Sequence, residues 1–398
     1  MIHNRCDKDR CTGCGACAKI CPMNCIEMIQ GDILGTIYPK VNTEKCVECG
    51  LCVNTCHAIK EVDIVKFRFP QKCFAARSCS DQVTEFSASG GIASSLYSYM
   101  IDHDGYAEGT FFDRKEGVVF KEVKNLKDLE RARNSKYVFS DLNDSFERYE
   151  QNLKTGRKCL FIGLPCQVAA MKCYLAATKV AVDDLMTVEI ICHGVPNYRL
   201  LCEHLNYIEK RVGKTIEKIA FRGPRSLYNF SCFADEKVVW KKGIKEDDTY
   251  YKGFSEDIIF RENCYNCNYA QNKRIADITI GDYSGLGKDD PVDFDTKQMS
   301  VVLCNTDKGV AFFNDVCNKE NIEKHERKVM EPMNAVGNPQ LRHPVNRPAK
   351  RDEFIKLYTE TKDFELSVRK TLKKQFAEYY LHLPIMKLKR IIKEFIKK

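Results

Sequence analysis

The sequence predicts a small α+β module rich in cysteine, followed by a larger α/β domain and a helical, basic tail. The chain has 398 residues, more than one hydrophobic core usually organises. Two runs of closely spaced cysteines fall within residues 11–56, and the composition then changes to mixed charged and β-branched residues. The remainder alternates strand-like and helical patterns, which favours a sheet covered by helices. We therefore place the three parts at residues 1–62, 70–345 and 346–398.

The first part repeats one cysteine pattern. Both copies have the spacing C-x2-C-x2-C-x3-C, and Gly15 and Gly50 occupy the same place in each copy. This spacing is typical of bacterial ferredoxins with two [4Fe-4S] clusters, in which the fourth cysteine of each run ligates the other cluster. The predicted ligands are Cys11, Cys14, Cys17 and Cys56 for one cluster, and Cys46, Cys49, Cys52 and Cys21 for the other.

Zinc is the alternative metal for these cysteines. Zinc sites usually separate two ligand pairs by a long loop, whereas here three cysteines follow one another at intervals of three, which favours clusters. His57 stands where the pattern would have a proline, but the ligand Cys56 is present. Cys6 and Cys25 lie outside both runs, and we interpret them as small buried apolar residues.

The larger domain is predicted from its alternating elements. We expect strands at residues 158–163, 187–192, 277–281 and 300–304, and helices at residues 92–101, 167–175 and 310–318. No G-x-G-x-x-G sequence follows an expected strand, so the usual dinucleotide-binding fingerprint is missing. Any flavin in this domain must be held in another way.

Four cysteines of the larger domain stand in short, turn-like contexts. Cys166 in GLPCQ and Cys192 in ICHG each lie at the end of an expected strand, where the loops of an α/β sheet gather ligands. Cys264 and Cys267 form a C-x2-C pair. The four predict a third [4Fe-4S] cluster, and buried thiols with a zinc knuckle are the alternative. The other cysteines are interpreted as structural: Cys73, Cys79, Cys159, Cys173, Cys202, Cys232, Cys304 and Cys317.

A loop rich in serine and glycine precedes the first expected helix of this domain. Ser87, Ser89, Gly90 and Gly91 would present free backbone N–H groups at a helix N-terminus, which attracts phosphate. Lys136 in NSKYV would add a positive charge. The simpler interpretation of the loop is a helix cap alone.

Composition indicates a cytoplasmic protein. A long chain with 22 cysteines and no apolar signal region at its start points to metal ligation in a reducing compartment, not to disulfides. No run of about 18 apolar residues is present. The net charge is +8, but both signs are interspersed, as on an ordinary solvated surface. We expect no nucleic acid partner.

Several motifs together resemble one known family. They are SASGGI, NSKYV, GLPCQVAAMK, EIICHGVP, FRGP and CYNCNYAQNKRIADITIGDYSG, in this order behind the two-cluster module. Over roughly residues 5–340, the chain resembles the beta subunit of coenzyme F420 hydrogenase/dehydrogenase, including relatives with a fused ferredoxin module. FRGP departs from the FRDK-like form of that family.

The resemblance implies an FAD, one [4Fe-4S] cluster in the main domain, and electron exchange with an organic two-electron carrier or substrate. The chain is then an iron–sulfur flavoprotein oxidoreductase that links ferredoxin or another redox protein to a small organic substrate or a deazaflavin such as F420. The alternative is an electron-transfer subunit without catalysis, which docks on a separate oxidoreductase. The catalytic residues are not predicted.

The C-terminal segment predicts a basic amphipathic helix that begins at about Pro384. Its basic residues are Lys387, Lys389, Arg390, Lys393, Lys397 and Lys398, and its apolar stripe is Ile385, Leu388, Ile392 and Phe395. Such a helix packs on its own domain, or rests on an acidic partner or on the anionic inner face of the membrane.

Deletion after Leu383 tests the membrane interpretation. We expect the truncated protein to lose binding to anionic vesicles while it keeps its iron, because the deleted segment carries six basic residues. High salt should weaken the binding of the full chain, since exposed charges are screened beyond about 10 Å at 0.1 M ionic strength. Vesicle co-sedimentation measures both effects, with neutral vesicles as the control. Equal binding of both chains would contradict the membrane interpretation.

Overall fold

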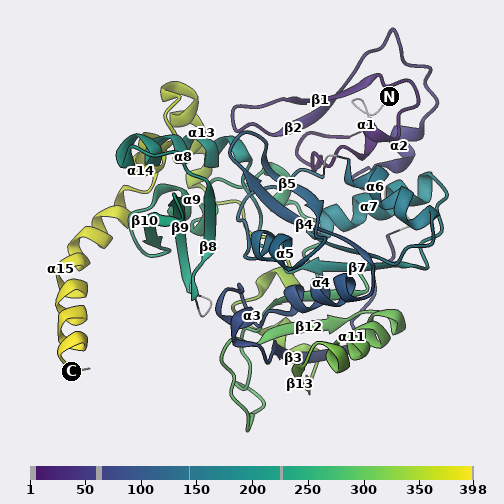
Figure 1. Ribbon diagram of the computed structural model, residues 1–398. Coiled ribbons are helices and arrows are strands. Elements are labelled where there is room, and N and C mark those ends of the chain that lie inside the picture. Colours follow the sequence, from purple (N-terminus) through teal and green to yellow (C-terminus); the bar gives the residue numbers. More distant parts are fainter. Residues whose placement is uncertain (1–5, 60–64, 143, 225–226, 397–398) are drawn as a thin grey trace.

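The computed structural model describes residues 6–59, 65–142, 144–224 and 227–396. The first part lies at one end of the molecule and is drawn in purple in Figure 1. It consists of an antiparallel pair, β1 (Ile26–Gln30) and β2 (Ile37–Val41), and two short helices, α1 (Ala16–Lys19) and α2 (Leu51–Thr55). This agrees with the expected ferredoxin-like module.

Both helices of the module begin after a glycine with a positive φ. The angle is 81° at Gly15 and 77° at Gly50. A side chain makes this conformation costly, whereas glycine adopts it readily. The coinciding glycines therefore turn the chain sharply from the loop with the first two cysteines of each run into the helix that carries the third.

The larger domain is built on a mixed sheet. Among the described residues, this sheet has eight strands. Their order is β13 (Ile322–Arg327), β3 (Lys72–Ser78), β12 (Ser300–Cys304), β11 (Ile278–Asp282), β7 (Leu185–Ile190), β6 (Cys159–Gly163), β4 (Tyr106–Asp113) and β5 (Gly117–Glu122). The central strands β11, β7, β6 and β4 are parallel, and the outer pairings are antiparallel. The predicted α/β architecture is confirmed, with antiparallel strands added at both edges.

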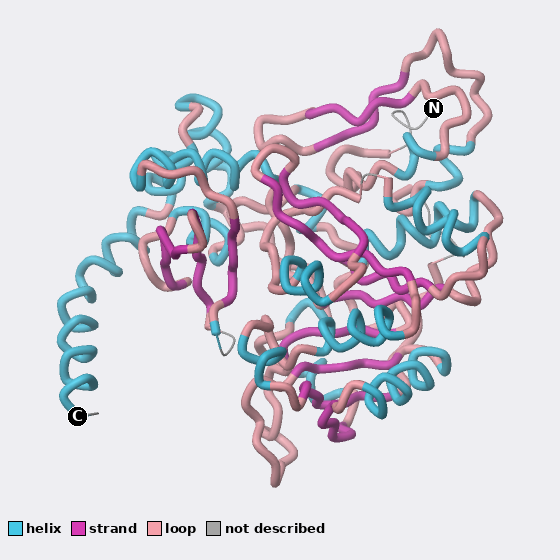
Figure 2. The backbone as a smooth tube through the Cα atoms, in the orientation of Figure 1, coloured by secondary structure: helices cyan, strands magenta, loops and turns pink. Residues whose placement is uncertain are grey.

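Helices cover both faces of this sheet (Figures 1 and 2). One face packs against α4 (Ile92–Asp102), α5 (Leu126–Ala132) and α11 (Asp307–Lys319), and the other against α6 (Ser145–Lys154) and α7 (Pro165–Ala177). Strand β6 shows the reason, because Leu160 and Ile162 enter the first core while Cys159 and Phe161 enter the second. All seven strands and helices expected in this domain are present, with ends shifted by a few residues.

A second core lies beside the main sheet and was not expected. It joins a three-stranded antiparallel sheet, β8 (Lys218–Arg222), β9 (Tyr228–Ala234) and β10 (Lys237–Gly243), to the helices α8 (Tyr198–Val212), α9 (Thr249–Ser255), α13 (Lys350–Thr361) and α14 (Phe364–Thr371). Phe354 and Phe364, from the expected tail, are buried in this core. The three-part division remains a prediction, but residues 350–371 pack as part of a folded unit.

The remaining helices are short, except the last. They are α3 (Asp81–Glu85), α10 (Glu262–Tyr265), α12 (Met330–Asn334) and the 3-10 turn Pro339–Leu341. The last helix, α15, spans Lys373–Ile396 and projects from the body of the molecule (Figure 2). The expectation that it begins at Pro384 is wrong, since Pro384 lies inside it. A proline removes one N–H donor, and the good helix formers around it continue the helix. Among the described residues, no helix is both long and apolar enough to cross a membrane.

A buried histidine connects three helices of the second core through hydrogen bonds. His204 on α8 is fully buried, with Nε2 3.0 Å from Oδ2 of Asp248 and Nδ1 2.5 Å from Oε1 of Glu365. Burial opposes protonation, but the two carboxylates outweigh it and raise the pKa of His204 to about 10. The imidazolium therefore links α8, α9 and α14 at neutral pH.

The substitution His204→Leu is expected to lower the free energy of unfolding by about 3–5 kcal/mol, because it leaves the buried carboxylate of Asp248 and the half-buried one of Glu365 without their cation. The wild-type contribution is fully present below the ordinary histidine pKa of 6.5 and is lost as the pH rises through about 10. The difference between variant and wild type should therefore shrink above pH 10. Thermal unfolding at several pH values measures it. His103→Leu, at an exposed histidine, is the control.

Candidate metal centres and cofactor site

The first predicted ligand set lines a single cavity in the module. Cys11, Cys14, Cys17 and Cys56 surround it together with Met28, Pro39 and Ala58. Cys56 comes from the second cysteine run and the other three from the first. The structure thus brings the four cysteines together in the exchange of fourth ligands that the duplicated pattern predicts.

The second predicted set lines another cavity, formed by Cys46, Cys49, Cys52 and Cys21. This cavity reaches the protein surface, where Cys49 is exposed. Met23 and Val47 on its rim are 45% and 61% exposed. One predicted ligand and two apolar side chains of this cavity are therefore exposed to solvent.

Each module cavity also holds a fifth cysteine that the spacing left unassigned. Sγ of Cys25 lies 3.4 Å from Sγ of Cys21, and Sγ of Cys6 lies 4.0 Å from Sγ of Cys56. Cys25 is buried, as expected, whereas Cys6 is half-buried. Their places beside the predicted ligands were missed because neither follows the repeated interval.

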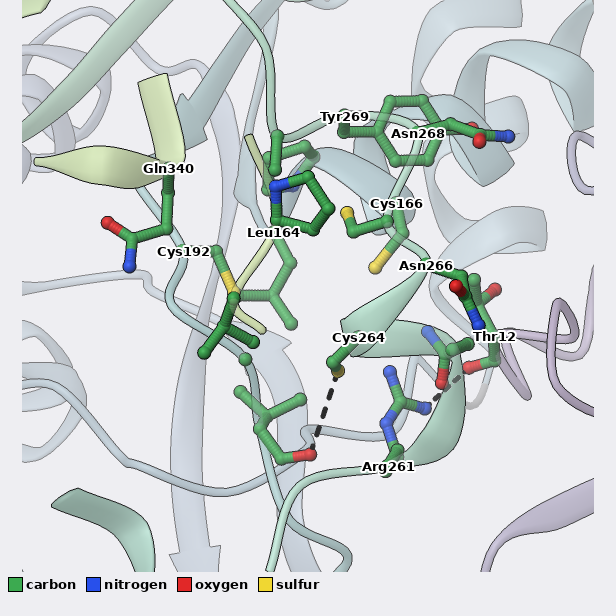
Figure 3. Close-up of a pocket in the computed structure, with 18 of the residues that line it drawn as sticks. Thr12, Leu164, Cys166, Cys192, Arg261, Cys264, Asn266, Asn268, Tyr269 and Gln340 are labelled. Atoms are coloured by element: carbon green, nitrogen blue, oxygen red, sulfur yellow. Dashed lines mark hydrogen bonds between the residues drawn. The ribbon is translucent and has the colours of Figure 1, made fainter. Parts of the chain in front are cut away.

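The third predicted set meets at one edge of the main sheet (Figure 3). Cys166 lies at the start of α7, directly after β6, and Cys192 follows β7, the parallel neighbour of β6. Cys264 lies in α10 and Cys267 just after it. Because the carboxyl ends of parallel strands lie at the same edge, the two isolated cysteines come together, and all four line one cavity.

The chemistry of the third set fits a cluster. Burial, together with the neighbouring thiols, raises the pKa of Cys192 to about 12 and that of Cys267 to about 11. Thiolates packed in a buried cavity repel one another unless a cation neutralises them, which iron does. Four cysteines without a carboxylate are the usual donors of [4Fe-4S] clusters. No three His, Cys, Asp or Glu side chains of the described ranges are grouped to hold a metal ion; in a cube, each cysteine binds its own iron.

The first and third cavities share a wall. Thr12, His57 and Ala58 line both of them. Oγ1 of Thr12 lies 3.0 Å from Nε2 of His57, and Nδ1 of His57 lies 2.6 Å from the hydroxyl of Tyr269. Burial lowers the pKa of His57 to about 4, so the ring is neutral at pH 7. The histidine in place of the usual proline thus connects the module to the main domain.

The loop before α4 is folded around its own hydroxyl groups. Ser87 donates a hydrogen bond to Val83 O (2.5 Å) and Ser89 to Met299 O (3.1 Å), while the N–H of Gly90 donates to Ser300 (2.9 Å). Gly91 precedes α4 with a φ of 81°, and none of the described side chains caps this 11-residue helix. Its first N–H groups are therefore left for another acceptor.

Lys136 is not joined to this loop. Among the described residues its amine donates to Ala132 O (2.6 Å) and Arg133 O (2.8 Å), at the end of α5, and no hydrogen bond connects it with residues 87–91. Burial lowers the pKa of Lys136 to about 7. Its part in a phosphate site remains a prediction.

Two segments of the chain match known protein families. Residues 156–329 match the family defined by the C terminus of the coenzyme F420 hydrogenase/dehydrogenase beta subunit. Residues 10–59 match a 4Fe-4S dicluster domain. The family resemblance is confirmed for these segments. Residues Cys166 to Cys267 fall inside the first match and both cysteine runs inside the second.

One curated relative is the coenzyme F420-dependent sulfite reductase of Methanocaldococcus jannaschii, 23% identical over 374 residues. The match covers 88% of this chain and 53% of that protein, so the chain spans about half the length of this relative. Among solved structures, the F420-reducing [NiFe] hydrogenase complex from Methanosarcina barkeri matches at 16% identity and a TM-score of 0.41, over 77% of this chain and 92% of that one.

Iron content tests the three cysteine sets. We expect anaerobically purified protein to hold about twelve iron atoms per chain, four per cube. Cys166→Ala should remove about four of them and leave the spectrum of the module clusters unchanged, because their ligands lie on other segments. The matched control is Cys173→Ala, at a buried cysteine of the same helix that does not line the cavity. A wild-type content of about eight would mean that the third cluster is absent.

Proposed function

We propose that the protein is an iron–sulfur flavoprotein oxidoreductase. Three [4Fe-4S] clusters would carry single electrons between a carrier such as ferredoxin and an FAD, and the FAD would exchange electron pairs with an organic substrate or an F420-like deazaflavin. The observation that carries the proposal is the grouping of twelve cysteines around three cavities, two of which share a wall. The matches to a dicluster domain and an F420-linked family support a role in electron transfer.

The positions of the cavities support the exchange of electrons with an outside protein at the surface of the module. A cluster held by the cavity of Cys49 would exchange electrons with an outside redox protein, and the exposed apolar side chains of Met23 and Val47 suit such a contact. The cavity of Cys11 and Cys56 belongs to the same module, and it shares a wall with the cavity of the main domain.

FAD is proposed because the path needs a converter. Clusters pass one electron at a time, whereas most organic substrates take two, and a flavin handles both. The uncapped N-terminus of α4 with Gly90 and Gly91 would hold the pyrophosphate, and Ser87 and Ser89 shape the loop. Lys136 follows α5, which packs on α4, and would supply positive charge there.

The alternative is a subunit that only transfers electrons and docks on a separate oxidoreductase. The exposed apolar rim of the Cys49 cavity suits docking as well as transient electron exchange. The two functions differ in whether the isolated chain binds FAD and turns over a small substrate.

Cofactor release decides between them. We expect denaturation of anaerobically purified protein to release about one FAD per chain, identified by mass, and F420 or another acceptor to reoxidise the dithionite-reduced protein. Lys136→Met should weaken FAD retention without loss of iron, and Lys218→Met, at a neighbouring exposed lysine, should not. Protein reconstituted with flavin and iron that retains no FAD would leave only the alternative.

A further inference from the structure

Arg261 is a buried cation with no acidic partner among the residues that the structure describes. Arg261 is 1% exposed, and its guanidinium lies 3.8 Å from the centre of the Phe139 ring. Nη1 donates a hydrogen bond to Thr12 O at 2.6 Å, whereas Nε and Nη2 are buried and have no hydrogen-bond partner among the described residues. Figure 3 shows the guanidinium turned toward Thr12, among the residues that line the main-domain cavity.

The other buried arginines near this cavity are paired. Arg274 lies 2.5 Å from Glu189, and Arg351 lies 3.2 Å from Glu262. No aspartate or glutamate is found among the described residues that line the main-domain cavity or the neighbouring module cavity. The groups around Arg261 that can become anions are therefore the cysteines.

An unpaired buried ion is costly. Burial removes the water that would solvate the charge, and each buried donor without a partner adds to the cost. A permanent negative charge in the cavity would offset this cost.

We propose that Arg261 is the countercharge of the [4Fe-4S] cluster held by Cys166, Cys192, Cys264 and Cys267, and that it raises the reduction potential of this cluster. The inference rests on the third cluster of the proposed function. A cube with four thiolates is an anion, and reduction adds one more negative charge. A fixed cation beside it stabilises the reduced form more than the oxidised form. Arg261 thus makes the main-domain cluster a better electron acceptor at its boundary with the module.

The test is a redox titration of the holoprotein followed by electron paramagnetic resonance, in which the main-domain signal is the one that Cys166→Ala removes. We expect Arg261→Met to shift the reduction equilibrium of this cluster at least tenfold toward the oxidised form, about 59 mV for a one-electron couple. Arg261→Lys, which keeps the charge, should stay close to wild type. The matched control is Arg351→Met, which removes an equally buried arginine that does not line the cavity.

Each result decides the question. Unchanged potentials in Arg261→Met, with about twelve iron atoms retained, would overturn the role of Arg261 and leave the third cluster intact. About eight iron atoms in the wild type would instead overturn the third cluster itself. If Arg261→Met and Arg261→Gln both lose the main-domain cluster, its retention in Arg261→Lys at the wild-type potential supports the countercharge, and its loss there contradicts it.

Discussion

The close packing of at least four cysteines around each of three small cavities is the constraint on which the rest of the structure depends. Thiolates crowded in this way repel one another, and burial strengthens the repulsion. In the module, two glycines with a positive φ and the exchange of one cysteine between the runs bring the cysteines together. In the main domain, it uses the shared edge of the parallel strands β6 and β7.

The contact between module and main domain follows from the same constraint. Thr12 and His57 lie next to the predicted ligands Cys11 and Cys56, and they form a hydrogen-bonded chain with Tyr269, two residues beyond Cys267. The positions of Thr12, His57 and Tyr269 are thus set by the predicted ligands that lie next to them, or two residues away, in the sequence. The arrangement gives the side-chain polar groups of these three residues hydrogen-bond partners at a buried boundary, where an unpaired donor or acceptor is costly.

The second core has a different basis. Its small antiparallel sheet leaves an apolar face that α8, α9, α13 and α14 cover, with the His204 ion triad at the centre. A buried ion pair of this kind contributes little net stability, but the loss of one partner is severe, so it favours one arrangement of the helices over others. Residues 350–371 therefore belong to a core although their composition resembles that of a solvated tail.

The sequence by itself determined whatever depends on local intervals. Cysteines three or four residues apart, such as Cys46 and Cys49, must lie close together in a tight turn, and strands such as β12 show their apolar character within five residues. Only the tertiary structure decided that His57 meets Tyr269, that Cys6 and Cys25 join the cavities, and that Arg261 lies beside the third cysteine set with no acidic partner in the part of the chain that the structure describes. The physical reason is that these contacts join segments up to about 250 residues apart, such as Thr12 and Arg261, and depend on how the layers pack, which no local interval records.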